Sequence, residues 1–423
     1  MTLPFITYGP AANGFLVRGM GNRLRPAERT TSKEPYVCIY PVLQPSLLAG
    51  RQAPEPGMPH LAEVLADDQL LHDLRSGSAA LVLDLSNEGF AFRHDTFEVL
   101  HDLLQERGVP RNCVIWVSQN RRAPADYYAT FGMGIRFAIY DAYVHAALRM
   151  AAHSPSSNDP EAYLQLFFER PKTHAFLCLN AEPRPHRVLT IAALGQAGLL
   201  DQGLISFLGF AQSKSGAGVM SLAAQDFMST HPGFAPFQSS FEEALQYSTP
   251  PRSVLTGNSL AFVVDEADYL DTFFSIVTET DFSAGEIDRI TEKSVKAMAH
   301  GHVTHVVGNP GSLALLRELG FITQDDAYDD VLDPVDRFHL LLEAVKRTAE
   351  AVNRDPQAWL SAHRDVIEAN FRLAVTGIAL KTYEDRYIEH LRSTFAEMIT
   401  PLARPQDSVA VRPSLSYPQG KLP

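Results

Sequence analysis

Short apolar runs typical of buried strands alternate with helix-like segments in two separate stretches of this chain. In the first stretch, residues 36–43, 79–86, 112–120 and 135–143 have the composition of strands, and 95–108 carries apolar residues at the three- and four-residue spacing of a helix. Strands that alternate with helices usually pair in parallel, with helices covering both faces of the sheet. The pattern therefore predicts an α/β domain built on a parallel sheet.

The alternation resumes after residues 151–160, a cluster of Ser, Pro, Asn and Asp typical of a domain boundary. Strands are expected at 173–180, 204–210, 272–279 and 303–308, and helices at about 186–199, 290–300 and 312–319. Residues 211–258 are rich in Ser, Gly and Pro and receive no assignment. The predicted domains are residues 1–165 and 166–345, both Rossmann-like, followed by C-terminal helices and a tail over 346–423.

Composition limits the possible functions. The 423 residues carry a formal net charge of −13, which argues against non-specific nucleic-acid binding because that needs a clustered basic surface. The three cysteines, Cys38, Cys113 and Cys178, are sparse and lie in or beside apolar runs, as expected of buried thiols in a reducing compartment. We find no signal sequence and no run of about 18 apolar residues. A cytoplasmic protein without a transmembrane segment is expected.

The loop "NAEPRPHR", after the strand predicted at 173–180, carries Arg184 and Arg187. Open α/β sheets bind ligands at the carboxyl ends of their strands, and a guanidinium can hold a diphosphate through two parallel hydrogen bonds. The alternative is two surface arginines that pair with acidic neighbours. This loop is therefore one candidate for anion binding.

The stretch "ITEKSVK" places Glu292, Lys293 and Lys296 at the start of the helix predicted near residue 290. A lysine beside the free backbone N–H groups of a helix start suits a leaving diphosphate, and a glutamate in that turn can accept ribose hydroxyls. A solvated helix face would show the same spacing.

Two further segments follow strands of the second domain. "GNPGS" contains Gly308, Asn309, Gly311 and Ser312, of which the glycines permit close backbone approach and the serine can cap a helix or contact an anion. A plain turn is the alternative. Thr278 and Glu279 come at the end of the strand predicted at 272–279, again at the carboxyl edge of the sheet.

Several other classes of site are excluded by their missing motifs. The chain contains no G-x-x-x-x-G-K-[ST] phosphate loop, no G-x-G-x-x-G after a strand and no G-x-S-x-G elbow. "HGHVTH" has His300, His302 and His305 at a spacing that fits no zinc pattern, so no metal site is predicted.

In combination these segments resemble nucleotide-sugar glycosyltransferases of the GT-B fold. "ITEKxxK" before "VVGNPGSLxxLRELGF", with "VTET" and the arginine loop upstream, is similar to the donor-binding region of the fucosyltransferase-like group and of uncharacterised bacterial and viral glycosyltransferases. The resemblance covers residues 170–345 well and the first half loosely, through "LDLSNEGF" and "VIWVSQN". "VTETDFSAGE" departs from the fucosyltransferase pattern, so fucose is not implied. The resemblance implies two Rossmann-like domains facing across a cleft.

The resemblance also implies roles for individual residues. Glu292 would hold the donor ribose, Lys293 and Arg187 the diphosphate, and Glu279 or its neighbours the sugar or ribose. A carboxylate of the N-terminal domain would act as general base on the acceptor hydroxyl, and Glu88, at the end of the strand at 79–86, is the candidate. A surface or helix-capping glutamate is the alternative for Glu88. The full set predicted to bind the donor is Arg184, Arg187, Thr278, Glu279, Glu292, Lys293, Lys296, Gly308, Asn309, Gly311 and Ser312.

The predicted reaction is transfer of a sugar from a nucleoside diphosphate to a glycan, surface-polysaccharide or lipid-linked acceptor. No cofactor besides the donor is expected, nor is a metal, and peripheral membrane association stays open. Two alternatives remain: a non-catalytic nucleotide-sugar-binding module, and another transferase on the same architecture, such as a pyruvyl or phosphosugar transferase.

Overall fold

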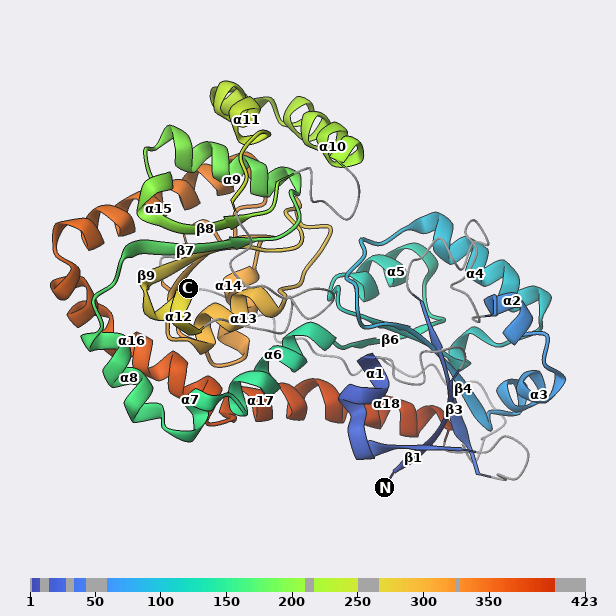
Figure 1. Cartoon of the computed structure of the whole chain (residues 1–423). Coiled ribbons are helices and arrows are strands. Elements are labelled where there is room, and N and C mark those ends of the chain that lie inside the picture. Colours follow the sequence, from blue (N-terminus) through green and yellow to red (C-terminus); the bar gives the residue numbers. More distant parts are fainter. Residues whose placement is uncertain are drawn as a thin grey trace, which may run out of the picture.

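The computed structural model places two parallel β-sheets side by side in one α/β molecule (Figure 1). The structure describes residues 2–7, 15–27, 34–42, 59–209, 217–249, 266–324 and 327–399. Each sheet is covered by helices, and long helices at the C-terminal end of the chain run along both halves. The predicted fold of two Rossmann-like domains followed by C-terminal helices is confirmed. The residue limits proposed for the domains stay a prediction.

The first sheet has six strands in the order β2-β1-β3-β4-β5-β6, and every neighbouring pair is parallel. Its strands are β1 (Leu3–Thr7), β2 (Leu24–Pro26), β3 (Tyr36–Pro41), β4 (Ala79–Leu85), β5 (Val114–Ser118) and β6 (Arg136–Ile139). β3, β4 and β5 are buried along their whole length, because helices shield both faces of the central strands. This burial explains their continuous apolar sequences.

The second sheet has four parallel strands in the order β10-β9-β7-β8. They are β7 (His174–Asn180), β8 (Gly203–Phe207), β9 (Thr272–Thr278) and β10 (Val303–Val307). Counted within each sheet, the first four strands follow one order, 2-1-3-4. In such a sheet the chain turns in opposite directions on the two sides of the first strand, and ligands bind outside the carboxyl ends at this switch point. In the second sheet the switch point lies between β7 and β9.

The helices up to residue 318 surround the two sheets (Figure 1). In the first half they are α1 (Phe15–Met20), α2 (Leu61–Val64), α3 (Asp68–Ser76), α4 (His94–Glu106), α5 (Ala123–Phe131), α6 (Ala142–Ala152), α7 (Pro155–Asn158) and α8 (Pro160–Glu169). In the second half they are α9 (Pro185–Gln196), α10 (Ala217–Thr230), α11 (Gln238–Ala244), α12 (Glu266–Leu270), α13 (Glu292–Ala299) and, after β10, α14 (Ser312–Glu318). Helices α10 and α11 pack outside α9, and α6 packs against α13, which joins the two halves.

The C-terminal helices return to the first domain. They are α15 (Pro334–Arg354), α16 (Pro356–Val375), α17 (Ile378–Tyr383), a π-helical turn (Glu384–Ile388) and α18 (Glu389–Ile399). Helices α15 and α16 contact β10 of the second sheet, whereas α18 contacts β1, β3, β4 and β6 of the first sheet (Figure 1). The Tyr383 hydroxyl bonds to both the N–H and the carbonyl of Asp141, and Arg121 donates to the Tyr387 hydroxyl at 2.7 Å. Helix α18 is thus part of the first domain.

Two sequence assignments are corrected. The strand expected at 135–143 ends at Ile139, because Asp141 caps α6 by accepting from the N–H groups of Tyr143 and Val144. Residues 211–258, which had no assignment, include α10 and α11. In contrast, the helix predicted at about 290–300 is confirmed as α13, and Gly301 follows its end with φ of +79°.

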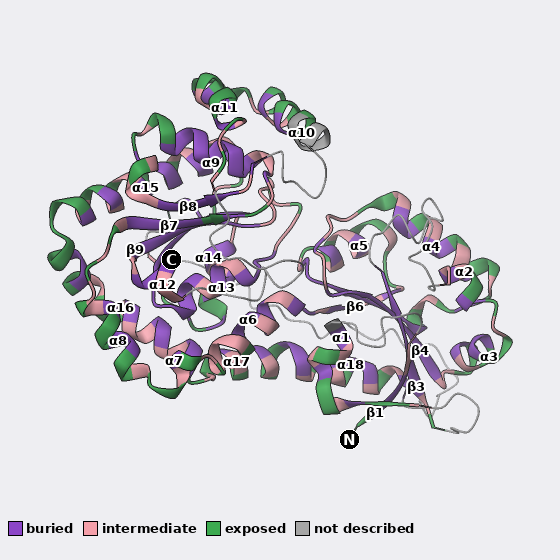
Figure 2. Ribbon diagram, in the orientation of Figure 1, coloured by how far each residue is buried: buried purple, intermediate pink, exposed green. Residues whose placement is uncertain are grey.

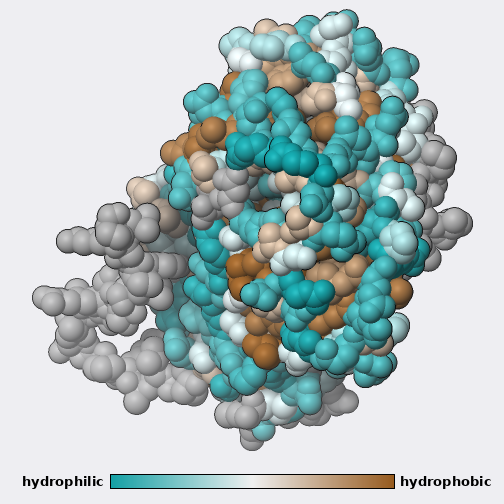
Figure 3. Space-filling model, turned by 90° about the vertical axis from the view of Figure 1, so that its left-hand side faces the viewer, coloured by the Kyte–Doolittle hydropathy of each residue, from teal (hydrophilic) through white to brown (hydrophobic). Residues whose placement is uncertain are grey.

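Burial follows the two sheets, as Figure 2 shows by the purple strands in both halves. One apolar cluster runs from β1 and α6 through α13 to the C-terminal helices, so the halves share a continuous core. Figure 3 shows a face on which hydrophilic side chains surround separate hydrophobic areas. In the described part of the chain, no helix is both long and apolar enough to cross a bilayer.

Candidate active site at the domain interface

The switch point of the second sheet is closed at its base by a hydrogen bond between its two strands. The Thr278 hydroxyl at the end of β9 donates to the side-chain oxygen of Asn180 at the end of β7. Above them, Nη1 of Arg184 in the β7–α9 loop donates to the carbonyl of Thr280 in the β9–α13 loop at 2.9 Å. The Arg184 side chain keeps 40% of its surface exposed. A cation therefore lies at the place where this fold binds ligands.

Arg187 and His186 hold the β9–α13 loop from below. Nη2 of Arg187 donates to the Glu279 carbonyl at 3.1 Å and Nη1 to the Glu182 carbonyl at 3.0 Å, while Nε2 of His186 lies 2.9 Å from the Glu279 carbonyl. Burial lowers the pKa of Arg187 to about 10. With only 4% of its surface exposed, Arg187 fixes the backbone of the loop. Its predicted diphosphate contact is untested.

The carboxylate of Glu279 is hydrogen-bonded to residues at the start of α13. Its carboxylate accepts from the Thr291 N–H at 3.1 Å, from the Thr291 hydroxyl and from the Ser294 hydroxyl. The side chain is 1% exposed. Glu279 therefore accepts hydrogen bonds from donors at the start of α13. This leaves its carboxylate little capacity for the predicted contact with a sugar or ribose.

Lys293 reaches from the first turn of α13 to the same loop. Its Nζ lies 3.2 Å from the hydroxyls of Thr280 and Thr291, and 3.0 Å from Oε1 of Glu292. Burial would raise the pKa of Glu292, but Lys293 and Lys296 lower it below its ordinary value, so this carboxylate is held ionised. The Lys293 side chain is 28% exposed. Lys293 and Arg184 thus flank Thr280 from two elements.

Lys296 does not lie with Glu292 and Lys293. One turn further along α13, it lines a separate cavity with residues of α1 and α6. The three charged residues of "ITEKSVK" therefore divide between two places: Glu292 and Lys293 at the sheet edge, and Lys296 in the cavity.

The "GNPGS" loop is stabilised internally. Gly311 has φ of +79°, a conformation that favours glycine, and the Ser312 hydroxyl donates to the Asn309 carbonyl at 2.7 Å. A carboxylate already occupies the N-terminus of α14, since Asp329 accepts from the N–H groups of Leu313 and Ala314 at 2.8 and 2.9 Å. An anion would have to compete with Asp329 here, which the sequence did not indicate.

The other residues of this loop pack beneath the candidate site. Oδ1 of Asn309 accepts from the N–H and hydroxyl of Ser283, while its Nδ2 is buried without a hydrogen-bond partner. A Cβ at Gly308 would lie 3.2 Å from Cγ of Glu279, so the glycine permits the close packing of β10 against this carboxylate.

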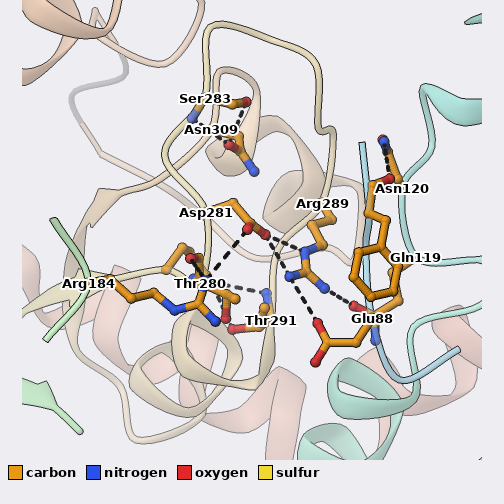
Figure 4. A network of polar contacts seen from close by, with 12 residues as sticks. Glu88, Gln119, Asn120, Arg184, Thr280, Asp281, Ser283, Arg289, Thr291 and Asn309 are labelled. Carbon is orange, nitrogen blue, oxygen red and sulfur yellow. Dashed lines mark hydrogen bonds and ion pairs between the residues drawn. The ribbon is translucent and has the colours of Figure 1, made fainter. Parts of the chain in front are cut away.

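Glu88 extends from the loop after β4 toward the second domain. Figure 4 shows its carboxylate pointing toward Arg289, and Oε2 lies 3.8 Å from Nη2 of that arginine. Burial raises the pKa of Glu88, and the positive charges of Arg289, Arg184 and Lys293 partly oppose this. The side chain is still 41% exposed. A solvent-accessible carboxylate with a raised pKa thus points toward Arg289 across the interface, within the electrostatic influence of Arg184 and Lys293.

Arg289 is the residue that sequence reasoning missed. Its Nη2 and Nε lie 2.6 and 2.7 Å from Asp281, and Nη1 donates to the Gln119 side chain of the first domain (Figure 4). It is 4% exposed and packs so closely over Gly89 that a Cβ there would lie 2.3 Å from its Cδ. "DRITEK" contains this arginine, but nothing in its local pattern distinguishes it from a surface cation.

Asn120 extends the interface beside Arg289. Its Nδ2 donates to the Glu286 carbonyl at 3.1 Å, and its Oδ1 accepts from the Asp288 N–H at 3.0 Å. Arg122 adds a bond to the Gly285 carbonyl at 3.0 Å. The β9–α13 loop is therefore bound by both domains.

In the described residues, no three His, Cys, Asp or Glu side chains group as metal ligands. Of the histidines considered in the sequence, His302 bonds to Ser275 and the Tyr269 carbonyl, and His305 to Thr348. Burial lowers the pKa of His300 and of His302 to about 3. These rings are core residues.

Comparisons with known proteins give little further information. No protein-family model matches the chain, and no curated protein matches it. Among solved structures, the chain is similar to an α,α-trehalose-phosphate synthase (UDP-forming) from Burkholderia vietnamiensis, with 13% identity, a TM-score of 0.43, and coverage of 94% of this chain and 99% of that chain. It is also similar to an α,α-trehalose 6-phosphate synthase from Burkholderia multivorans, with 14% identity, a TM-score of 0.40, and coverage of 91% and 76%. At these scores the similarity carries no argument about function.

Proposed function

We propose that the protein is a glycosyltransferase that moves a sugar from a nucleoside diphosphate to a hydroxyl of a carbohydrate or lipid-linked acceptor. One observation carries the proposal: Glu88 of the first domain lies near enough to Arg184 and Lys293, at the switch point of the second sheet, for their charges to oppose the rise in its pKa. The diphosphate would lie on Arg184 and Lys293. Glu88 would face the acceptor.

The leaving diphosphate develops negative charge as its bond to the sugar breaks. Two cations fixed beside it stabilise this charge most when they need no rearrangement. Arg184 is held by the Thr280 carbonyl, and Lys293 by two hydroxyls and Glu292. The side chains of Arg184 and Lys293 are both partly exposed, so each can contact a ligand while its existing bonds hold it in place. In this proposal the protein's own cations perform the role that a metal ion performs in other transferases.

Glu88 would take the proton from the acceptor hydroxyl. A general base works best when its pKa lies near the operating pH, and burial moves the pKa of Glu88 upward in that direction. Arg289 limits this rise and holds the adjacent loop, which places it as a positioning residue. Arg187 supports the same loop from the second domain.

The test is thermal unfolding with UDP, GDP, ADP, CDP and dTDP, with and without Mg²⁺. A ligand at 100 times its dissociation constant stabilises a protein by about 2.7 kcal/mol. We expect one nucleotide to raise the midpoint of the wild type but not of Lys293→Met. The matched control is Lys346→Met, which removes a surface lysine paired with Glu343 on α15. Nucleotide binding that is equal in both variants would contradict the assignment of Lys293.

The second step measures transfer with the nucleotide sugar that matches the binding nucleotide. Nucleoside diphosphate release that depends on an acceptor and is lost in Glu88→Gln supports catalysis. Donor binding without release, and no effect of Glu88→Gln, would instead identify a binding module. Activity only with a donor other than a nucleotide sugar would identify another transferase.

A further inference from the structure

A cavity of about 740 Å³ lies between the domains, apart from the site described above. Its walls come from α1, α6 and the start of α7 on one side, and from α12 and α13 on the other. Figure 1 shows α6 between the two halves of the molecule. Cavities of 300–1,000 Å³ are the usual size for small-molecule sites. The volume alone does not indicate a ligand, but the lining does.

Most of the surface that lines the cavity is apolar. It includes Ala142, Ala146, Ala147, Met150, Ala151, Pro155 and Ala299. Short side chains on α6 and α13 leave the space open where longer ones would fill it. A ligand here would therefore bury an apolar body.

The charged part of the lining is mainly positive. Arg18, Arg149 and Lys296 face a single carboxylate, Glu266, whose Oε1 already accepts from the Ser156 hydroxyl at 3.1 Å. Within the described residues, the side chains of Arg149 and Lys296 form no hydrogen bond or ion pair. Burial lowers the pKa of Lys296 to about 8, although Glu292 on the same helix opposes this. A half-buried ammonium without a direct partner would gain from an anion.

One wall is fixed in advance by a chain of hydrogen bonds. The Tyr140 hydroxyl lies 3.1 Å from Nδ1 of His145, and Nε2 of His145 lies 3.2 Å from Oε1 of Glu384. Gly19 packs against this hydroxyl so closely that a Cβ would lie 1.8 Å from it. Tyr140 and His145 are thus held in place beside the cavity, which gives this wall a defined shape.

We propose that this cavity binds a small amphipathic anion, with its phosphate or carboxylate on Lys296 and Arg149 and its apolar body against α6 and α13. The site is separate from the Lys293 side of the helix, so it stands whether or not the proposed transfer reaction is correct. A phosphate ester with an alkyl chain and a fatty acid share the required chemistry. Inorganic phosphate lacks the apolar body, and an alcohol lacks the negative charge.

The experiment is isothermal titration calorimetry of the full chain with octyl phosphate, octanoate, octanol and inorganic phosphate. We expect octyl phosphate or octanoate to bind at least tenfold more tightly than both octanol and inorganic phosphate. Lys296→Met and Arg149→Met should each weaken this binding by about tenfold or more, and Ala146→Phe should abolish it by filling the space. Lys381→Met, which removes an exposed lysine of α17, is the control and should bind as the wild type does.

Each outcome supports or overturns one feature of the proposed site. Equal binding of octanol and octyl phosphate would overturn the anionic site and leave a purely apolar cavity. Equal binding of inorganic phosphate would overturn the requirement for an apolar body. Unchanged affinity in both Lys296→Met and Arg149→Met would overturn the location. Lys293→Met is expected to retain octyl phosphate binding while losing nucleotide binding, which distinguishes failure of this proposal from failure of the transferase proposal.

Discussion

Arg289 of the second domain and Glu88 of the first lie 3.8 Å apart, and the same guanidinium pairs with Asp281 at 2.6 Å. The arginine is buried, whereas Glu88 is partly exposed. Asp281 is the closer of the two carboxylates and has the larger effect on the pKa of Arg289. This arrangement links the domains, and burial still keeps the pKa of Glu88 above its ordinary value.

Replacing Arg289 by Gln should destabilise the protein by about 3–5 kcal/mol, because Asp281 loses its partner in a buried setting. Urea unfolding measures the loss. The control is Arg93→Gln, whose pair with Asp95 is exposed at the surface and should contribute less than about 1 kcal/mol. Equal losses in the two variants would show that Arg289 does not stabilise the interface.

Glu88→Gln should reduce transfer by about 10²–10⁴-fold while the unfolding midpoint stays that of the wild type, because the side chain is 41% exposed.

Glu279→Gln should instead lower the stability of the fold. Its carboxylate accepts three bonds at the start of α13, and the loss should be about 1–3 kcal/mol of stability. Steady-state kinetics and urea unfolding on the same preparations separate the two roles. A stable, inactive Glu279→Gln variant would restore the predicted donor contact.

Asp329→Ala tests whether the "GNPGS" loop binds an anion. The carboxylate of Asp329 caps α14, so its removal should cost about 1–2 kcal/mol. Nucleotide affinity, measured by calorimetry, should not change if the donor lies on Arg184 and Lys293. A tighter nucleotide complex in this variant would mean that the freed N–H groups now hold phosphate.

Asp141→Asn should change how stability depends on pH. Burial raises the pKa of Asp141 to about 7, whereas an unfolded chain has a value of about 3.9. Between these values the folded state binds the proton more tightly, so this residue's contribution to stability increases as the pH falls from about 7 to about 4. Asparagine still caps α6 but does not titrate.

The stability of wild type relative to Asp141→Asn should therefore rise by roughly a few kcal/mol from pH 8 to pH 5. Urea unfolding at several pH values measures this difference. A difference that stays constant across that range would show that Asp141 is ionised throughout.

The fold was largely predictable from the sequence because its signals are local. Continuous apolar runs such as 79–86 identify strands covered on both faces, and Gly301 marks the end of a helix by its backbone conformation. The end of β6 was predicted wrongly, since Asp141 stops the strand by capping the next helix. That cap was not recognised, and "YDAY" by itself fits a strand.

The site was only partly predictable because its contacts join distant residues. Glu88, Arg184 and Lys293 were chosen for their places after strands and at a helix start, and the fold brings them to one edge. Arg289 was missed, since its partners Asp281, Gln119 and Glu88 become neighbours only when the domains meet. The occupation of the α14 N-terminus by Asp329 could not be inferred either, because the acidic run 324–333 reads as a solvated loop.

The return of α18 to the first sheet has a consequence for how the protein is made. Helix α18 contacts β1, β3, β4 and β6, yet it is synthesised after the whole second domain. While the ribosome is still building that domain, the part of the first sheet that α18 contacts stays uncovered, and exposed apolar surface of this kind favours aggregation. The first domain can therefore complete its fold only after the second domain has been synthesised.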